Sequence, residues 1–431
     1  MAGNAHGEKS YKDLSAPHRW MLLILVSMGS SVIYGPIYLK MVFYDPLMQA
    51  LGCTNTELNT LVSIYGIAAV VFYFFSGVIA DKIRVRTLSW IGYLGVALLT
   101  FYYATLPSYG TLVVVFILYA VFSILIWWGT RYKLVRMICD EEEYSQKIGL
   151  SYGIYGAIGL VLSLIQAAVV AAFPSAQMGV TALLIISGVL ILICGALAFF
   201  FIPKFEGEIV ADAKMFDFRA AGQALKIPAV WFAALTMFCV YFVNVGATFS
   251  TPFMSGVLAA PVALVSIISI VRSYGITVFS SPIFGWISKK VGSPSKVIFC
   301  GMIGAIVCLA ALILLPHNPS ILVVVAVLVC LLSFATNGLY GIASGQLAEA
   351  HIPPHLFGTG VGLISIIGLC PDAFLHTWFG VIMDQQGNDA YTTIFMILIA
   401  FCVGGMLFAA LTLRAGKKNL AKMEAAGEKA E

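Results

Sequence analysis

Long apolar runs, separated by short polar links, fill almost the whole chain. A helix of about 20 apolar residues crosses the hydrocarbon core of a bilayer, where lipid offers no partner for backbone polar groups. Of the 431 residues, 61% are hydrophobic and 10% are charged, whereas about a quarter of a soluble domain is charged. The sequence therefore predicts an all-α, multi-pass integral membrane protein and excludes an ordinary soluble protein.

The apolar runs predict twelve transmembrane helices, with approximate limits at 20–44, 57–80, 87–106, 111–133, 148–173, 180–202, 229–255, 261–287, 296–315, 320–344, 356–383 and 390–413. Lys and Arg gather in cytoplasmic loops, so the charges test this count. The second, fourth, sixth and eighth links contain Lys or Arg in or beside them, the odd-numbered links contain none, and both ends of the chain are basic. We therefore expect both termini in the cytoplasm. The net charge of +4 follows from topology, and no nucleic-acid partner is expected.

The longest and most polar link, from Phe205 to Ile227, divides the chain into two halves. The pattern Gly149-x-x-x-Gly153, followed by Ile158-Gly159-Leu160, returns at Gly358, and a charged stretch at Gly77 returns in degenerate form at Gly285, with nearly the same offset. Two matches at one offset predict two six-helix repeats. The predicted domains are a tail (1–19), a six-helix bundle (20–203), a central loop (204–228), a second bundle (229–413) and a tail (414–431).

The stretch Gly77-Val-Ile-Ala-Asp81-Lys82-Ile-Arg84-Val-Arg86 resembles the loop signature between the second and third helices of the major facilitator superfamily. Both have a glycine, an aspartate four residues later and spaced cations, although Arg84 stands near a position where the family often has glycine. The resemblance covers the chain from about Trp20 to Leu413. It implies secondary transport by alternating access, in which two six-helix halves rock about a midplane site.

Within the superfamily, two spans resemble those of the organophosphate/phosphate antiporters and their sugar-acid-transporting relatives. They are Tyr38-Leu39-Lys40-Met41-Val42-Phe43 and Val240-Tyr241-Phe242-Val243-Asn244-Val245-Gly246. In the antiporters, arginines at both positions grip phosphate. Lys40 and Asn244 occupy them here, so the resemblance implies an anion preference without the same phosphate grip.

Three ionisable residues fall inside predicted spans, where a charge is expensive and is a functional candidate by default. Lys40 faces the transport cavity or extends its long stem to the outer interface. Arg272 holds a carboxylate, sulfonate or phosphate, or pairs with an acid on a neighbouring helix. Asp372, beside Pro371, carries a coupling proton or forms a permanent ion pair with Arg272 or Lys40. Two cations against one acid favour an anionic substrate, which would compensate the excess buried charge.

Further candidates for the substrate route are polar or aromatic residues inside spans. Arg131 points inward or anchors the fourth span at the interface, and the others line the route or pack between helices. These others are Tyr34, Tyr38, Trp127, Tyr241, Asn244, Asn337 and Tyr340. The spacings of four between Tyr34 and Tyr38 and of three between Tyr241 and Asn244 place each pair on one helix face.

The charged loop lies outside the bilayer in this topology, so it does not bind the substrate. Asp81 stands at a helix end, where it can pair with cations or a helix N-terminus. We therefore expect Gly77, Asp81, Lys82, Arg84 and Arg86 to form a latch that holds the halves in one state.

The sequence predicts a proton-coupled symporter for a carboxylate or sugar acid, with an exchanger of phosphate esters or dicarboxylates as the alternative. A transporter-like ligand sensor is a third hypothesis, disfavoured because the longest link has only about two dozen residues. We expect that the protein is not an enzyme and needs no cofactor. We also expect no metal site, because the acidic run 140–143 is typical of a solvated surface. The expected partners are a small anion, protons or a counter-transported anion, and lipid. A monomer in a bacterial inner (plasma) membrane is expected, and the polar start shows no signal peptide.

Overall fold

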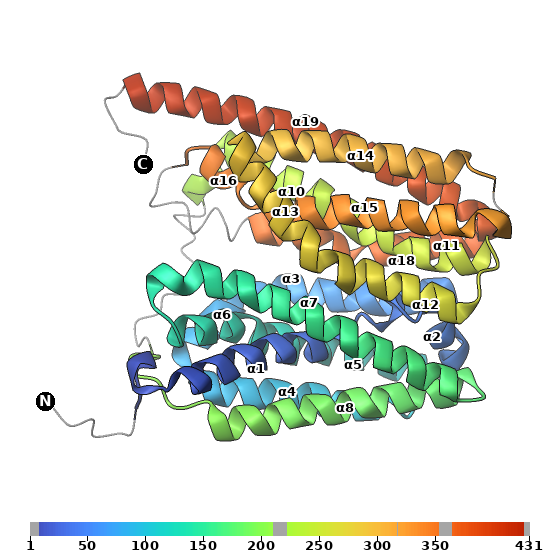
Figure 1. Cartoon of the computed structure of the whole chain (residues 1–431), viewed down its shortest axis with the longest axis horizontal. Helices are drawn as coiled ribbons and strands as arrows, with labels where there is room; N and C mark the ends of the chain where they lie inside the picture. Colours follow the sequence, from blue (N-terminus) through green and yellow to red (C-terminus); the bar gives the residue numbers. More distant parts are fainter. Residues whose placement is uncertain (1–7, 210–221, 317, 353–363, 426–431) are drawn as a thin grey trace, which may run out of the picture. The chain divides into compact units, whose positions relative to one another are not determined.

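The computed structural model describes residues 8–209, 222–316, 318–352 and 364–425. Regular structure in these residues is helical, apart from an isolated parallel bridge between Lys9 and Phe205 (Figure 1). The chain divides into two compact units, Met1–Met215 (unit 1) and Phe216–Glu431 (unit 2). The prediction of an all-helical chain is confirmed, whereas the finer domain limits given above stay predictions.

The helices of unit 1 are long where the sequence is uninterrupted and break at Gly-Pro or at irregular turns. In chain order they are η1 (Tyr11–Asp13), α1 (Ala16–Tyr34), η2 (Leu39–Met41), α2 (Tyr44–Leu51), α3 (Asn55–Lys82), α4 (Val85–Tyr103), α5 (Tyr109–Ala120), the π-helical turn η3 (Val121–Ile126), α6 (Trp127–Met137), α7 (Glu141–Ala172) and α8 (Ala176–Phe201).

Unit 2 is built in the same manner. Its helices are α10 (Pro228–Gly246), η4 (Ala247–Phe249), α11 (Ser250–Gly256), α12 (Val262–Ile270), the π-helical turn η5 (Val271–Gly275), α13 (Ile276–Val291), α14 (Pro294–Leu314), η6 (Pro319–Ile321), α15 (Leu322–Ala343), α16 (Gln346–Glu349), η7 (Cys370–Ala373), α18 (Leu375–Gln386), η8 (Gly387–Asp389) and α19 (Ala390–Ala425). Gly358 and Gly362, which carry the second copy of the glycine repeat, lie outside the described residues.

Ten stretches of the described chain are long and apolar enough to cross a membrane. They are Asn55–Lys82, Val85–Tyr103, Tyr109–Met137, Gln146–Ala172, Ala176–Phe201, Pro228–Gly256, Val262–Val291, Pro294–Leu314, Pro319–Ala343 and Ile364–Ala421. The prediction of a multi-pass membrane protein is confirmed. The count of twelve and the cytoplasmic location of both termini stay predictions.

Two predicted helices differ from the structure. The run 20–44 is not one helix, because α1 ends at Tyr34 and is followed by Gly35 and Pro36. Proline lacks an N–H and clashes with the preceding turn, so the chain turns there before η2 and α2 begin. In the run 356–383, the turn η7 at Cys370–Ala373 interrupts the described helix just before α18.

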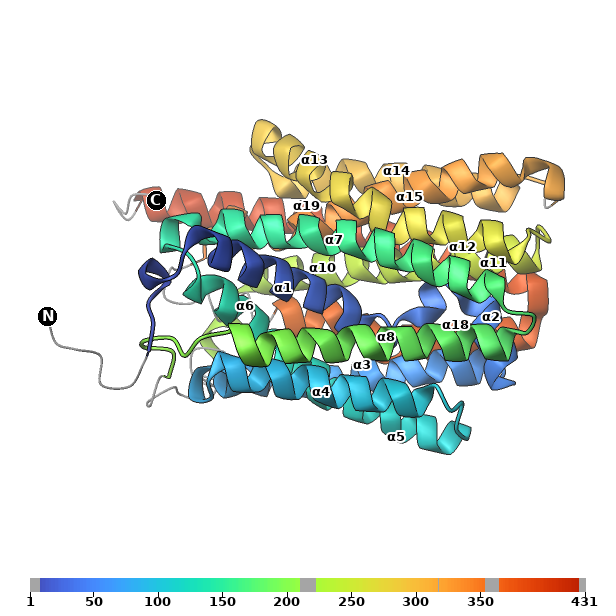
Figure 2. The ribbon, with the colours of Figure 1, turned by 60° about the horizontal axis from the view of Figure 1, so that its bottom comes forward.

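Helices pack closely within each unit where glycine removes a side chain. In unit 1, α4 and α8 run side by side, and in unit 2, α19 packs against both α10 and α14 (Figures 1 and 2). A Cβ on Gly29 of α1 would lie 1.6 Å from the hydroxyl oxygen of Tyr93 on α4. A Cβ on Gly129 of α6 would lie 2.7 Å from the carbonyl oxygen of Ser76 on α3. A larger residue at either position would force the helices apart.

Candidate functional site

The polar centre of unit 2 forms around Asp372. The short turn η7, which begins at Cys370 and contains Pro371, places the Asp372 side chain between helices, where only 7% of the residue is exposed. The Tyr241 hydroxyl of α10 donates a 2.7 Å hydrogen bond to Asp372 Oδ2. The other carboxylate oxygen, Oδ1, lies 3.3 Å from Nε2 of His376. The acid predicted from the sequence is therefore held by a phenol and an imidazole.

Four other residues predicted from the sequence lie close together on α10 and α15. The rings of Tyr241 on α10 and Tyr340 on α15 lie 5.3 Å apart between centroids. Asn244 donates a 3.0 Å hydrogen bond to Asn337 Oδ1 on the same pair of helices. The structure thus brings Tyr241, Tyr340, Asn244 and Asn337 together with Asp372, which we call the Asp372 cluster.

His376 also belongs to this cluster, although the sequence analysis did not predict it. The residue is fully buried, and its ring stacks on Phe249 with centroids 6.2 Å apart. The available signal was its spacing of four from Asp372 inside an apolar run, since histidine can exchange a proton near neutral pH. A buried Asp–His pair can take up and release a proton without leaving an isolated charge.

Arg272 lies in the π-helical turn η5 and is 3% exposed. Its guanidinium reaches the Thr251 hydroxyl at 3.5 Å, and Thr251 shares a 2.8 Å hydrogen bond with Ser269. π-Helical turns inside α-helices occur frequently at functional sites, because they offset the side chains and free a backbone carbonyl. Arg272 is thus buried beside hydroxyl groups.

Arg131 is the corresponding buried arginine of unit 1, and 3% of it is exposed. It lies on α6 and faces α7, where its guanidinium reaches Ser151 Oγ at 3.4 Å. The guanidinium carbon also lies 4.4 Å from the ring centroid of Tyr152 and 5.6 Å from that of Tyr132. Within the described side chains, no carboxylate lies within 4.0 Å of Arg131. Of the two predicted roles, inward-facing and interface anchor, the structure places Arg131 inside the unit.

Aromatic residues surround the π-helical turn of unit 1. The Tyr34 hydroxyl donates to the Ser123 carbonyl at 3.1 Å, and the Tyr65 and Ser123 hydroxyls are 3.0 Å apart. The ring of Tyr38 packs edge-on against that of Tyr65, with centroids 5.7 Å apart. Tyr34 and Tyr38 therefore both lie near this turn, but they do not share a helix face as predicted, because α1 ends at Tyr34.

Trp127 is placed differently from its neighbour Trp128. Trp127 is fully buried against Tyr93, with ring centroids 4.4 Å apart, and its indole nitrogen has no hydrogen-bond partner among the described residues. Trp128 packs edge-on against Tyr34 and Tyr132, with centroids 6.5 and 5.4 Å apart. The indole that packs against the predicted Tyr34 thus belongs to Trp128, which was not among the predicted residues.

Lys40 lies in the turn η2 and is 4% exposed. Its ammonium donates to the side-chain oxygen of Asn59, whose amide nitrogen donates to the Tyr44 hydroxyl at 2.9 Å. Asn59 stands one turn after the start of α3 at Asn55, so Lys40 packs near a helix end. The lysine is buried beside polar groups and does not extend into water.

Ion pairs and a hydrogen bond to other residues of unit 1 hold the charged loop between α3 and α4. Arg84 pairs with Glu8 at 2.6 Å and with Glu208 at 2.8 Å, and the Val85 backbone N–H donates to Glu208 Oε2 at 3.1 Å. The hydrogen bond from Arg84 to Glu8 is the main cause that raises the pKa of Arg84 above its ordinary value. Glu208 thus caps the N-terminus of α4, where a carboxylate is favoured.

The other loop residues make separate contacts. Asp81 lies 3.8 Å from the Lys133 ammonium, which also donates to the carbonyl oxygens of Ala80 and Glu208. The Arg86 guanidinium stacks 4.9 Å from the ring centroid of Phe199, Lys82 is exposed, and a Cβ on Gly77 would meet nothing within 4 Å. Neither Glu8 nor Glu208 was predicted from the sequence, because both are far from Arg84 along the chain.

Charged groups buried inside membrane-spanning stretches mark functional sites of membrane proteins. The sequence model of the Major Facilitator Superfamily matches residues 20–371, so the chain belongs to this family. Its members are transporters and not enzymes. The protein therefore carries a substrate and sits in a lipid bilayer.

Two curated relatives come from Escherichia coli K12. Inner membrane protein YqcE is 27% identical over 392 residues, which cover 89% of this chain and 92% of the relative. Inner membrane protein YihN is 27% identical over 416 residues, which cover 95% of this chain and 98% of the relative.

Solved structures share the fold. A bacterial homologue of the human lysosomal transporter Spinster, in an inward-facing and unoccupied conformation, matches with a TM-score of 0.74 at 15% identity, covering 95% of this chain and 99% of the other. A point mutant of the nucleoside transporter NupG matches with a TM-score of 0.73 at 14% identity, covering 92% of this chain and 99% of the other.

Proposed function

We propose that the protein is a secondary active transporter that moves a small organic anion together with protons by alternating access. The observation that carries the anion assignment is Arg131. Its guanidinium is 3% exposed and has a hydroxyl and two aromatic rings around it, with no carboxylate within 4.0 Å among the described side chains. A buried charge without a counter-charge is costly, and a bound anion would supply it. A planar guanidinium can also hold a carboxylate with two parallel hydrogen bonds.

The surroundings of Arg131 also limit the shape of the substrate. The rings of Tyr132 and Tyr152 lie beside this arginine, and Trp128 packs against Tyr132 and Tyr34. Such a surface favours a ligand that combines an anionic group with an apolar or sugar-like body, because sugars and rings pack on aromatic faces. Carboxylates and sugar acids fit this description, with Lys40 and Arg272 as further cations for the anion.

Proton coupling is assigned to the Asp372–His376 pair. The pair is buried, its members lie 3.3 Å apart, and Tyr241 donates to the same carboxylate at 2.7 Å. Protonation of either member changes the charge of the cluster, and this change can be linked to the state of the transporter. Asn244, Asn337 and Tyr340 then contact the uncharged part of the substrate.

We also propose that the chain crosses the inner membrane of a bacterium twelve times, with both termini in the cytoplasm. We further propose that the protein is a monomer and that its domains have the limits predicted from the sequence. The stretch Ile364–Ala421 has 58 residues, enough for two crossings, and α1 is one more apolar helix besides the other nine stretches. The names of the two Escherichia coli relatives support the inner membrane. The likeness of the first and seventh spans to the organophosphate and sugar-acid branch supports an anionic substrate.

Ligand-induced stabilisation tests the proposal. Purified protein is heated with carboxylates, sugar acids, sulfonates and phosphate esters, because a ligand that binds the folded state raises the melting temperature by mass action. The expected result is a shift with a carboxylate or sugar acid that is lost in Arg131→Gln and kept in Arg136→Gln, an exposed arginine of the same helix. A shift of equal size in Arg131→Gln would refute the anion site. Stabilisation by phosphate esters alone, with counterflow independent of a pH gradient, would select the exchanger instead.

A further inference from the structure

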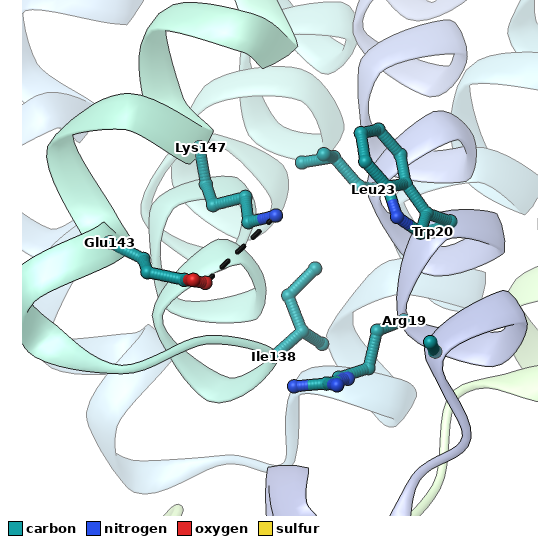
Figure 3. Close-up of a pocket in the computed structure, with 7 residues that line it drawn as sticks. Arg19, Trp20, Leu23, Ile138, Glu143 and Lys147 are labelled. Carbon is teal, nitrogen blue, oxygen red and sulfur yellow. Dashed lines mark ion pairs between the residues drawn. The ribbon is translucent and has the colours of Figure 1, made fainter.

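A small pocket lies between α1 and α7 in unit 1, away from the residues discussed above (Figure 3). It has a volume of about 130 Å³ and is lined by Ala16, Arg19, Trp20, Leu23, Ile138, Glu143 and Lys147. Sites for drug-sized ligands measure roughly 300–1,000 Å³. The pocket therefore has room for a small charged group, such as a phosphate, and not for a whole organic substrate.

The pocket carries more positive than negative charge. The ammonium of Lys147 and the carboxylate of Glu143 lie 3.9 Å apart across one helical turn, and both face the space between the two helices (Figure 3). Arg19 borders the same space from α1, and no carboxylate of the described residues lies within 4.0 Å of it. Two cations against one partly exposed acid leave one positive charge for an anion.

The position of the pocket indicates that the anion belongs to a lipid. Trp20 is 47% exposed, and Lys147 lies 4.8 Å from its ring centroid. An exposed tryptophan next to a cation at the beginning of a spanning helix is typical of the membrane–water interface. A soluble anion would need neither the indole nor any apolar surface beside the pocket.

Apolar surface continues from the pocket toward the membrane core. Ile24 follows Trp20 by one turn of α1 and is 45% exposed, and Leu150 follows Lys147 by about one turn of α7 and is 38% exposed. Both helices begin at the same end of unit 1 (Figure 1), so both side chains lie on the membrane side of the charged residues. We propose that Arg19, Lys147 and Trp20 bind the phosphodiester of an anionic phospholipid, whose acyl chains pack on Ile24 and Leu150.

The inference does not depend on the transported substrate, and basic pockets between spanning helices are known to bind anionic headgroups. Its test uses the full-length protein purified in detergent and titrated with phosphatidylglycerol, phosphatidylcholine or inorganic phosphate. The melting temperature is measured at each concentration, and native mass spectrometry counts the retained lipids. We expect phosphatidylglycerol to raise the melting temperature, with phosphatidylcholine and inorganic phosphate giving much smaller shifts.

Charge variants separate the site from general lipid binding. Arg19→Gln and Lys147→Gln should each weaken the apparent affinity for phosphatidylglycerol about five-fold, which is the usual effect of one cation near an anionic membrane surface. Glu143→Gln should strengthen it by a similar factor, and a folding defect cannot mimic a gain. Lys12→Gln, an exposed cation outside the pocket, should leave it unchanged.

Three outcomes would overturn the proposal. Equal stabilisation by phosphatidylcholine would mean that only the acyl chains bind. Stabilisation by inorganic phosphate that is lost in Arg19→Gln would identify a soluble anion site. Wild-type affinity in both Arg19→Gln and Lys147→Gln would show that these cations do not contact the headgroup.

Discussion

The two units bury different chemistry, although the sequence predicts that they are repeats of one another. In unit 1, Arg131 is surrounded by a hydroxyl and aromatic rings. In unit 2, Asp372 accepts a hydrogen bond from Tyr241 and lies beside His376. The site around Arg131 is cationic and can bind an anion, whereas the site around Asp372 is acidic and can take up a proton. We propose that Arg131 of unit 1 carries the substrate charge and that Asp372 and His376 of unit 2 carry the coupling proton.

The largest effect is expected for Arg131→Gln. Two charge-assisted hydrogen bonds are worth about 1.5–3 kcal/mol each, so their loss should lower uptake of the anion roughly 100-fold or more. Uptake is measured in proteoliposomes, with protein content and melting temperature as folding controls. Arg131→Lys keeps the charge but not the fork and should retain part of the activity. If Arg272→Ala abolished uptake while Arg131→Gln did not, the anion would be held by unit 2 and the comparison would fail.

Asp372→Asn should separate coupling from transport. The amide keeps the shape and can still accept from Tyr241, but it cannot exchange a proton. We expect accumulation driven by a pH gradient to be lost, while exchange of labelled for unlabelled substrate continues at no less than about a tenth of the wild-type rate. Both assays use the same proteoliposomes. If this variant still accumulated substrate at the wild-type level under a pH gradient, Asp372 would have no part in the coupling mechanism.

A smaller effect is expected for His376→Gln. Histidine is the side chain whose ordinary pKa, about 6.5, lies in the physiological range. If His376 shares the proton with Asp372, its replacement should change the pH dependence of uptake while changing the maximal rate only a few-fold. The initial rate of uptake is recorded across the physiological pH range. An unchanged pH profile would leave Asp372 as the proton carrier and reduce His376 to packing against Phe249.

These clusters were predictable from the sequence to different degrees. Tyr241, Asn244, Asn337 and Tyr340 stand out as polar residues in apolar runs, and regular helices carry them to one place. Trp127 and Trp128 could not be assigned in this way, because the π-helical turn η3 directly before them changes the helical phase.

Long-range partners were also beyond the sequence. Glu8 and Glu208 contact Arg84, although they are 76 and 124 residues away along the chain. A local sequence pattern cannot predict contacts over such distances. The break of the first predicted helix did have a signal, because Gly35 and Pro36 follow the last residue of α1. Composition and charge placement predicted the helical membrane fold because burial in lipid constrains every span in the same way.

The smallest effect on binding is expected for Asp81→Asn, which tests the assignment of the charged loop as a latch. Asp81 contacts Lys133 at 3.8 Å, and half of its side chain is exposed, so this single pair contributes little to stability. Its loss should shift the balance between conformational states and change the transport rate a few-fold, with the ligand-induced thermal shift unchanged. Arg86→Gln, which removes a cation that stacks on Phe199, is the matched variant on the same loop. If Asp81→Asn weakened binding as much as transport, the loop would act on the substrate site itself, and the separation between site and latch would be wrong.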